Sequence, residues 1–181
     1  MIARTALLLA LVTGPCWGQS RPNPAVDGML TALRSAPNED AAAALEGQIR
    51  AQWLEAASPA LRLLLARGMR ELNEGAAGEA VDSFDAALDL DPDLIEAWRG
   101  RAQARSRLGD AAGAVRDIQE LLRREPRSFA ALQDLSRMAE GRADWRGALA
   151  AQQKLLEIDP RTPGGQTRLR DLRRRALGDD T

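Results

Sequence analysis

Residues 92–126 read PDLIEAWRGRAQARSRLGDAAGAVRDIQELLRREP, and residues 126–160 repeat this order of helix, turn, helix and proline. The prolines Pro92, Pro126 and Pro160 stand 34 residues apart. A period of about 34 residues is typical of stacked helical hairpins, because one hairpin cannot bury its apolar face alone and packs on its neighbour. The stretch therefore predicts a helical repeat protein.

Small residues recur at fixed positions in each period. Two helices can cross closely only where their side chains are small, so we expect the paired helices to cross at these positions. Bulky residues in a third column should seal each hairpin against the next. The three columns hold Gly68, Ala102 and Ser136; Ala80, Ala114 and Ala148; and the bulky Leu64, Trp98 and Leu132.

With these columns, the chain resembles the tetratricopeptide repeat family. The resemblance covers residues 61–162 and implies an all-α fold, a right-handed α-solenoid of three tandem hairpins. Its units are expected at residues 61–94, 95–128 and 129–162. The family's common role implies that the chain holds another protein.

The N-terminus is typical of an export signal. A positively charged start precedes an apolar run of eight residues, 5–12, which Gly14-Pro15 ends. The run is too short to span a bilayer, which takes about 20 apolar residues. We expect a signal peptide over residues 1–18, a flexible lead-in over 19–25, and a periplasmic protein.

Cys16 allows a second interpretation, as the acylated cysteine of a bacterial lipoprotein. Such sites usually present a small residue just before the cysteine, whereas Pro15 stands there. Lipoprotein anchoring is therefore the less favoured prediction. Cleavage after Gly18 would remove the only cysteine, so the mature chain would depend on its apolar core rather than on a disulfide.

Helical segments flank the repeats. Residues 26–57 predict a hairpin whose apolar stripe needs a partner, and we expect it to cover the exposed end of the first repeat. Residues 163–178 predict a last helix that caps the solenoid with a polar outer face. Alternatively, its arginines form a patch for anionic lipid or an acidic partner. These are Arg168, Arg170, Arg173, Arg174 and Arg175.

Charge is unevenly distributed, although the chain carries a net charge of only −1. Residues 61–94 hold three arginines and eight acids, and residues 95–128 hold eight arginines and five acids. These charges either pair between neighbouring units or pattern a groove for a peptide with hydrophobic and acidic residues. The resemblance implies a concave groove lined by the first helix of each unit. Its residues would be Leu65, Met69, Leu72, Arg99, Gln103, Arg107, Gln133, Arg137 and Glu140.

Family members that bind chaperones clamp the terminal carboxylate of a peptide with lysine, asparagine and arginine side chains. The matching positions hold none of these residue types, so the resemblance does not extend to recognition of a chaperone tail. The positions are Leu65, Met69, Gly100, Ala130 and Asp134.

The residue inventory argues against catalysis. The chain has no histidine, and its one cysteine lies in the signal segment. The mature chain would thus lack an imidazole base, a thiol nucleophile and the common transition-metal ligands, so we expect no enzyme activity, metal or cofactor. The near-neutral charge and the export signal also disfavour a nucleic-acid partner.

The predicted function is a non-catalytic adaptor of the bacterial periplasm, which binds a segment of a protein partner in its groove. The partner and the oligomeric state are unknown. The alternative is a structural or self-assembling protein of the cell envelope, which would use its end helices to stack on itself or to lie on a membrane surface.

Overall fold

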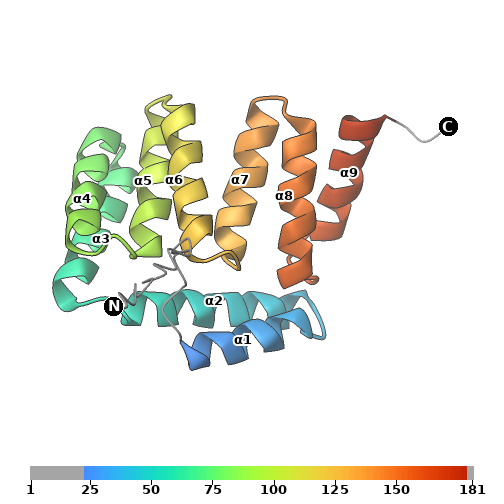
Figure 1. Cartoon of the computed structure of the whole chain (residues 1–181), viewed down its shortest axis with the longest axis horizontal. Coiled ribbons are helices and arrows are strands. Elements are labelled where there is room, and N and C mark those ends of the chain that lie inside the picture. Colours follow the sequence, from blue (N-terminus) through green and yellow to red (C-terminus); the bar gives the residue numbers. More distant parts are fainter. Residues whose placement is uncertain (1–22, 179–181) are drawn as a thin grey trace, which may run out of the picture.

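A computed structural model describes residues 23–178, and every helix or strand assigned in this range is an α-helix. Helices α3 to α8 stand side by side in chain order, α9 closes one end, and α1 and α2 lie across the lower ends of the others (Figure 1). The prediction of an all-α fold is confirmed. The helices are α1 (Pro24–Arg34), α2 (Glu39–Glu55), α3 (Pro59–Glu74), α4 (Ala77–Leu90), α5 (Ile95–Arg107), α6 (Ala111–Arg124), α7 (Phe129–Gly141), α8 (Trp145–Ile158) and α9 (Gly165–Leu177).

The repeats form the hairpins α3/α4, α5/α6 and α7/α8, and each packs on the next. Side-chain oxygens of Ser58, Asp110 and Ser128 each accept the backbone N–H three residues later and so cap the first turns of α3, α6 and α7. Helix α6 ends with Glu125 as its C-cap because the next residue, Pro126, cannot continue a helix. The predicted solenoid of tandem hairpins is confirmed.

The small-residue columns mark the helix crossings. In the first hairpin, the ring of Phe84 fills the space beside Gly68, where an added Cβ would lie 2.8 Å from the ring. Gly100 of the second repeat meets the same ring, so Phe84 joins two hairpins. The other residues in the two small columns are fully buried: Ala80, Ala102, Ala114, Ser136 and Ala148.

A buried ion-pair cluster holds the second hairpin together. Asp117 of α6 is 2% exposed and lies 2.8 Å from Arg101 and 2.8 Å from Arg105, both on α5. Arg101 also binds Asp85 of the first repeat. Charges of neighbouring units therefore pair here, as one of the two interpretations of the charge pattern requires.

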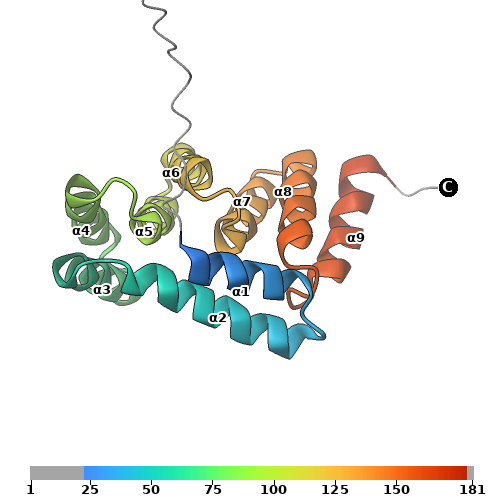
Figure 2. The ribbon, with the colours of Figure 1, turned by 60° about the horizontal axis from the view of Figure 1, so that its bottom comes forward.

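The N-terminal hairpin does not cover the exposed end of the first repeat, so that prediction was wrong. Figure 2 shows α1 and α2 along the side of α3, α5 and α7. Leu33 and Ile49 are fully buried and share one apolar cluster with Phe129 and Leu132 of the third repeat. Trp53 stacks on Phe129, with ring centroids 5.8 Å apart. An apolar stripe shows that a helix needs a partner, but it does not show which partner.

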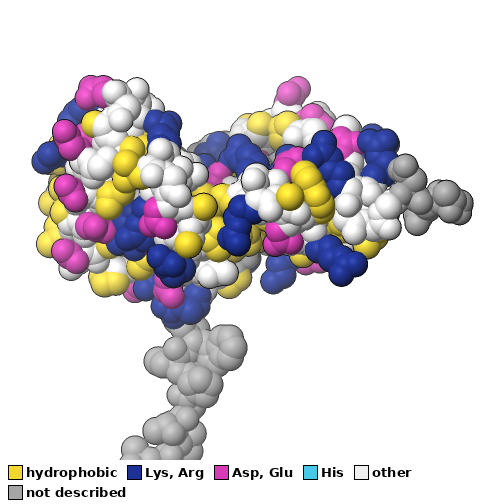
Figure 3. Space-filling view, turned by 90° about the horizontal axis from the view of Figure 1, so that it is seen from above, with side chains coloured by type: hydrophobic (Ala, Val, Ile, Leu, Met, Phe, Trp, Pro, Cys, Tyr) yellow, Lys and Arg dark blue, Asp and Glu magenta, His cyan; other side chains and the backbone are white. Residues whose placement is uncertain are grey.

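The hairpin also bridges a break in the stack. A cleft of about 430 Å³ separates α6 from α8, and its lining includes Leu122, Leu135 and Ala151. The space-filling view shows the surface hollowed between the left and right parts of the molecule (Figure 3). Because α2 contacts α5 and α1 contacts α8, the hairpin ties the second repeat to the third.

Candidate functional site

A cavity of about 310 Å³ lies between α2, α3 and α5. Its apolar wall is made by α3 and α2, and its polar wall is made mainly by α5. Met69 and Leu54 are 44% and 39% exposed and present apolar surface side by side in this cavity. The lining residues are Arg50, Ala51 and Leu54; Arg62, Leu65, Ala66 and Met69; Phe84; and Glu96, Arg99, Gly100 and Gln103.

The polar wall is organised by two ion pairs. Arg99 binds the buried carboxylate of Asp134 on α7 at 2.9 Å, and Arg50 binds Glu46 on α2 at 3.1 Å. Glu96 lies with these arginines in the cavity wall. Burial raises the pKa of Glu96, and the positive charges of Arg99 and Arg50 oppose that rise. The cavity therefore combines an apolar surface with arginine side chains that are bound to neighbouring carboxylates.

Four of the predicted groove residues meet in this cavity: Leu65, Met69, Arg99 and Gln103. Leu72 does not, because it is 1% exposed and belongs to the core of the first hairpin. Its backbone carbonyl accepts a hydrogen bond from Arg107 of the second repeat.

The other predicted groove residues, on α7, lie apart from this cavity. Gln133 and Arg137 line a second cavity of about 240 Å³, and Arg137 binds Asp134 at 2.5 Å. Glu140 is held by Arg168 of α9 at 2.7 Å. The structure thus divides the predicted continuous groove into two cavities. Of its arginines, Arg99 and Arg107 each bind a group of a neighbouring repeat.

Helix α2 supplies the part of the site that sequence reasoning missed. Arg50 and Leu54 form one side of the main cavity. The stripe of Ile49 and Trp53 marked α2 as amphipathic, but no signal in the sequence placed its neighbouring face against α3 and α5.

A buried pair of carboxyl groups lies where α2 meets the turn after α8. Asp159 and Glu46 are 0% and 8% exposed. Burial, and then the neighbouring carboxyl of Glu46, raise the pKa of Asp159 to about 7. The hydroxyl of Thr162 donates to Glu46 at 3.5 Å, and Gln133 donates to Thr162 at 3.1 Å. This junction therefore holds a proton near neutral pH.

Two further properties concern the described range, residues 23–178. No helix in this range has the length and hydropathy needed to cross a membrane. The same range contains no group of three histidine, cysteine, aspartate or glutamate side chains placed to hold a metal ion.

Comparison with known sequences supports the repeat assignment. A tetratricopeptide repeat-containing protein of Rhizobium etli is 26% identical over 162 residues, which is 90% of this chain and 79% of that protein. Cellulose synthase operon protein C of Escherichia coli is 31% identical over 116 residues, but the match covers 62% of this chain and only 10% of that protein. No protein-family model matches the chain.

Solved structures support the same fold. The first tetratricopeptide domain of Spaghetti (RPAP3), bound to the HSP90 peptide SRMEEVD, matches with a TM-score of 0.59 and 22% identity over 64% of this chain and 92% of that chain. The Yersinia enterocolitica type III secretion chaperone SycD, in complex with a peptide of the translocator YopD, matches with a TM-score of 0.59 and 14% identity over 66% of this chain and 96% of that chain.

The stacked hairpins and their small-residue crossings define an α-helical repeat protein of the solenoid class. Within that class, the chain has the tetratricopeptide repeat fold, with the 34-residue period that its sequence shows and with similarity to the Rhizobium repeat protein.

Proposed function

We propose that this protein is a non-catalytic interaction module that holds a short segment of a partner protein in the cavity between α2, α3 and α5. One observation carries the proposal: large apolar side chains from α2 and α3 remain partly exposed in a concave site, next to Arg50 and Arg99. The two structural neighbours bind peptides, which is consistent with this use of the fold.

The cavity sets the chemistry of the partner segment. Its volume of about 310 Å³ suits one or two large side chains but excludes a folded domain, since ligand pockets start at about 300 Å³. A segment with a large hydrophobic residue beside an acidic one would bury apolar area against Met69 and Leu54 and place a carboxylate near the arginines. A terminal carboxylate clamp is not proposed, because Leu65 and Met69 stand where its polar groups would be.

Crosslinking tests whether the partner binds in this cavity. A photoreactive residue is placed at Met69 in the cavity or, as the control, at Leu63, which is 72% exposed outside it. We expect a covalent adduct with one envelope protein from position 69 only. Equal adducts from both positions would show that the cavity is not the binding site.

Affinity then tests the chemistry. Once the crosslinked segment is known, it is made as a peptide and titrated against the native chain, Met69→Glu and Leu63→Glu. The first variant should bind at least about tenfold more weakly, which corresponds to about 1.4 kcal/mol, while the second should bind as the native chain does. Unchanged affinity of Met69→Glu would refute the proposal.

We also propose that the module acts in the periplasm. The support is the N-terminal sequence alone, because residues 1–22 lie outside the part that the structure describes. Sequencing of the protein from a periplasmic fraction should show a mature N-terminus at or within a few residues of Gln19. A chain that keeps Met1 in the cytosolic fraction would contradict export.

A further inference from the structure

The two ends of the repeat stack carry opposite charges. Helix α4 lies at one end of the stack and α9 at the other (Figure 1). In the view from above, many acidic side chains line the left end, and arginines gather at the right end (Figure 3). Because α1 and α2 pack elsewhere, the first repeat keeps an uncovered outer surface.

The acidic end is a stripe along α4. Glu79, Asp82 and Asp89 are exposed and lie three or seven residues apart, so they share one side of the helix. None of the three makes an ion pair with an arginine or lysine in the described range. The negative charges of Glu79 and Asp82 raise the pKa of the nearby Arg67, but the guanidinium of Arg67 binds Glu71 at 2.7 Å.

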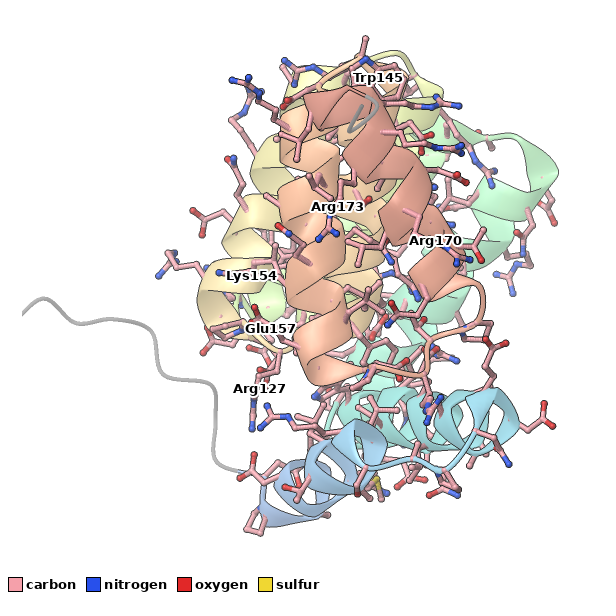
Figure 4. The ribbon with its side chains drawn as sticks, turned by 90° about the vertical axis from the view of Figure 1, so that its right-hand side faces the viewer. Arg127, Trp145, Lys154, Glu157, Arg170 and Arg173 are labelled. Carbon is pink, nitrogen blue, oxygen red and sulfur yellow. The ribbon has the colours of Figure 1, made fainter. Side chains whose placement is uncertain are left out.

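The basic end is a stripe along α9. Figure 4 looks onto this end and shows Arg170 and Arg173 on α9, with Lys154 and Glu157 on the neighbouring α8. Arg170 donates a hydrogen bond to the hydroxyl of Thr167 at 3.2 Å. Arg173 and Lys154 make no ion pair with a carboxylate of residues 23–178.

The other arginines of α9 are already used within the molecule. Arg168 and Arg175 bind Glu140 of α7 at 2.7 and 3.7 Å, and Arg174 binds Asp171 at 2.5 Å. The patch of five arginines suggested by the sequence is therefore reduced to a narrow strip around Arg170 and Arg173, which fits one helix better than a broad membrane surface.

Apolar side chains accompany both stripes. Leu90 is the last residue of α4, and Leu177 is the last residue of α9. The side chain of each is 65% exposed. Leu63, on the outer side of α3, is 72% exposed. At about 1.5 Å per residue, the stripe from Glu79 to Leu90 spans about 17 Å along α4, and the stripe from Arg170 to Leu177 spans about 11 Å along α9. The stripes have opposite charge, and each ends in an exposed leucine.

We propose that α9 of one copy docks on α4 of the next copy, so that the protein assembles head to tail. The two contacting surfaces are different, so the contact is heterologous and leaves both outer ends free to bind further copies. Taken alone, either end could be explained more simply as a terminal helix whose polar outer face is in contact with water. It does not predict that one end pairs with the other.

Charge reversal tests the pairing directly, with residues 19–181 as the protein. One variant reverses the acidic stripe (Glu79→Lys, Asp82→Lys and Asp89→Lys), and the other reverses the basic stripe (Arg170→Glu and Arg173→Glu). Each variant then carries two like-charged ends and should be monomeric by sedimentation velocity at about 0.02 M salt, where the Debye length exceeds about 20 Å. An equal mixture of the two variants should recover the association of the native chain.

Two controls keep the test specific. The same three charges are reversed on exposed positions of α2 (Glu39→Lys, Asp40→Lys and Glu55→Lys), and this variant should associate as the native chain does. Met69→Glu, which alters the proposed peptide cavity, should also associate normally, so failure of that cavity and failure of the end-to-end contact can be told apart. Circular dichroism confirms that all variants are folded.

The native chain should form oligomers whose average mass rises with concentration and falls at about 0.5 M salt, where screening weakens exposed charge pairs. A native chain that stays monomeric at low salt up to its solubility limit would overturn the proposal. So would a mixture of the two reversed variants that associates no more than either variant alone, or a loss of association in the α2 control.

Discussion

Replacement of Asp159 by asparagine should make the protein more stable at alkaline pH and leave it nearly unchanged at acid pH. Asp159 is fully buried beside Glu46, and its pKa rises from 3.8 to about 7. The native state therefore keeps a proton that the unfolded chain releases above pH about 4. This contribution to stability is complete below that pH and is lost as the pH rises through about 7.

The magnitude follows from the same shift. A rise in pKa from 3.8 to about 7 corresponds to about 4 kcal/mol of unfolding free energy, at about 1.4 kcal/mol for each tenfold change in proton affinity. Because Glu46 lies beside Asp159 and is itself bound by Arg50 at 3.1 Å, we expect about 2 to 4 kcal/mol. Asparagine keeps a carbonyl oxygen for the N–H of Arg161, which Asp159 accepts at 3.1 Å.

Urea denaturation followed by circular dichroism provides the measurement. Asp159→Asn and the native chain should differ little at pH about 4, and the variant should be more stable by about 2 to 4 kcal/mol at pH about 8. A hydrogen bond from the Ser83 hydroxyl lowers the pKa of Glu71, so the stability that Glu71 contributes is lost as the pH falls. Both proteins contain Glu71, so this effect cancels in the difference between their unfolding free energies. Asp91→Asn, at the same turn of the first repeat, controls for loss of a carboxylate. A difference between native chain and Asp159→Asn that stays constant with pH would refute the reasoning.

Three further changes test the packing. Asp117→Ala should cost about 3 kcal/mol in urea denaturation, because it leaves Arg101 and Arg105 without the buried carboxylate between them; a loss below about 0.5 kcal/mol would show that the cluster is not stabilising. Ala114→Leu should overfill a fully buried crossing and cost about 1 to 3 kcal/mol, so an unchanged melting temperature would contradict the assigned register. Phe129→Ala should cost about 3 to 5 kcal/mol, and hydrogen exchange should then show protection falling first in α1 and α2. Equal loss of protection in α5 and α6 would show that the hairpin is not a separate unit.

Local sequence rules predicted the repeats well. Proline cannot continue a helix that precedes it, and small residues must lie where two helices cross. Pro126 and Ala114 therefore indicate structure within a few residues of themselves. The hairpin boundaries and the crossings therefore followed from a 34-residue pattern that needs no knowledge of distant contacts.

The candidate site was only partly predictable for the opposite reason. Leu65, Met69, Arg99 and Gln103 lie in the main cavity as the first helices of the units imply. Leu72 faces the core instead, and Arg137 is bound to Asp134. A residue's position along a helix does not show whether a later repeat will cover it or pair its charge.

By itself, the sequence determined that this protein is a stack of three helical hairpins with an additional helix at its C-terminal side, because each hairpin is specified by capping, proline and small-residue positions within about 34 residues. Only the tertiary structure decided where α1 and α2 lie, which cavity they enclose and which acids and arginines at the two ends lack an ion-pair partner within residues 23–178. Those outcomes depend on contacts between residues such as Trp53 and Phe129, 76 positions apart. An amphipathic helix must bury its apolar face. The place where it packs depends on which apolar surface the other helices leave uncovered.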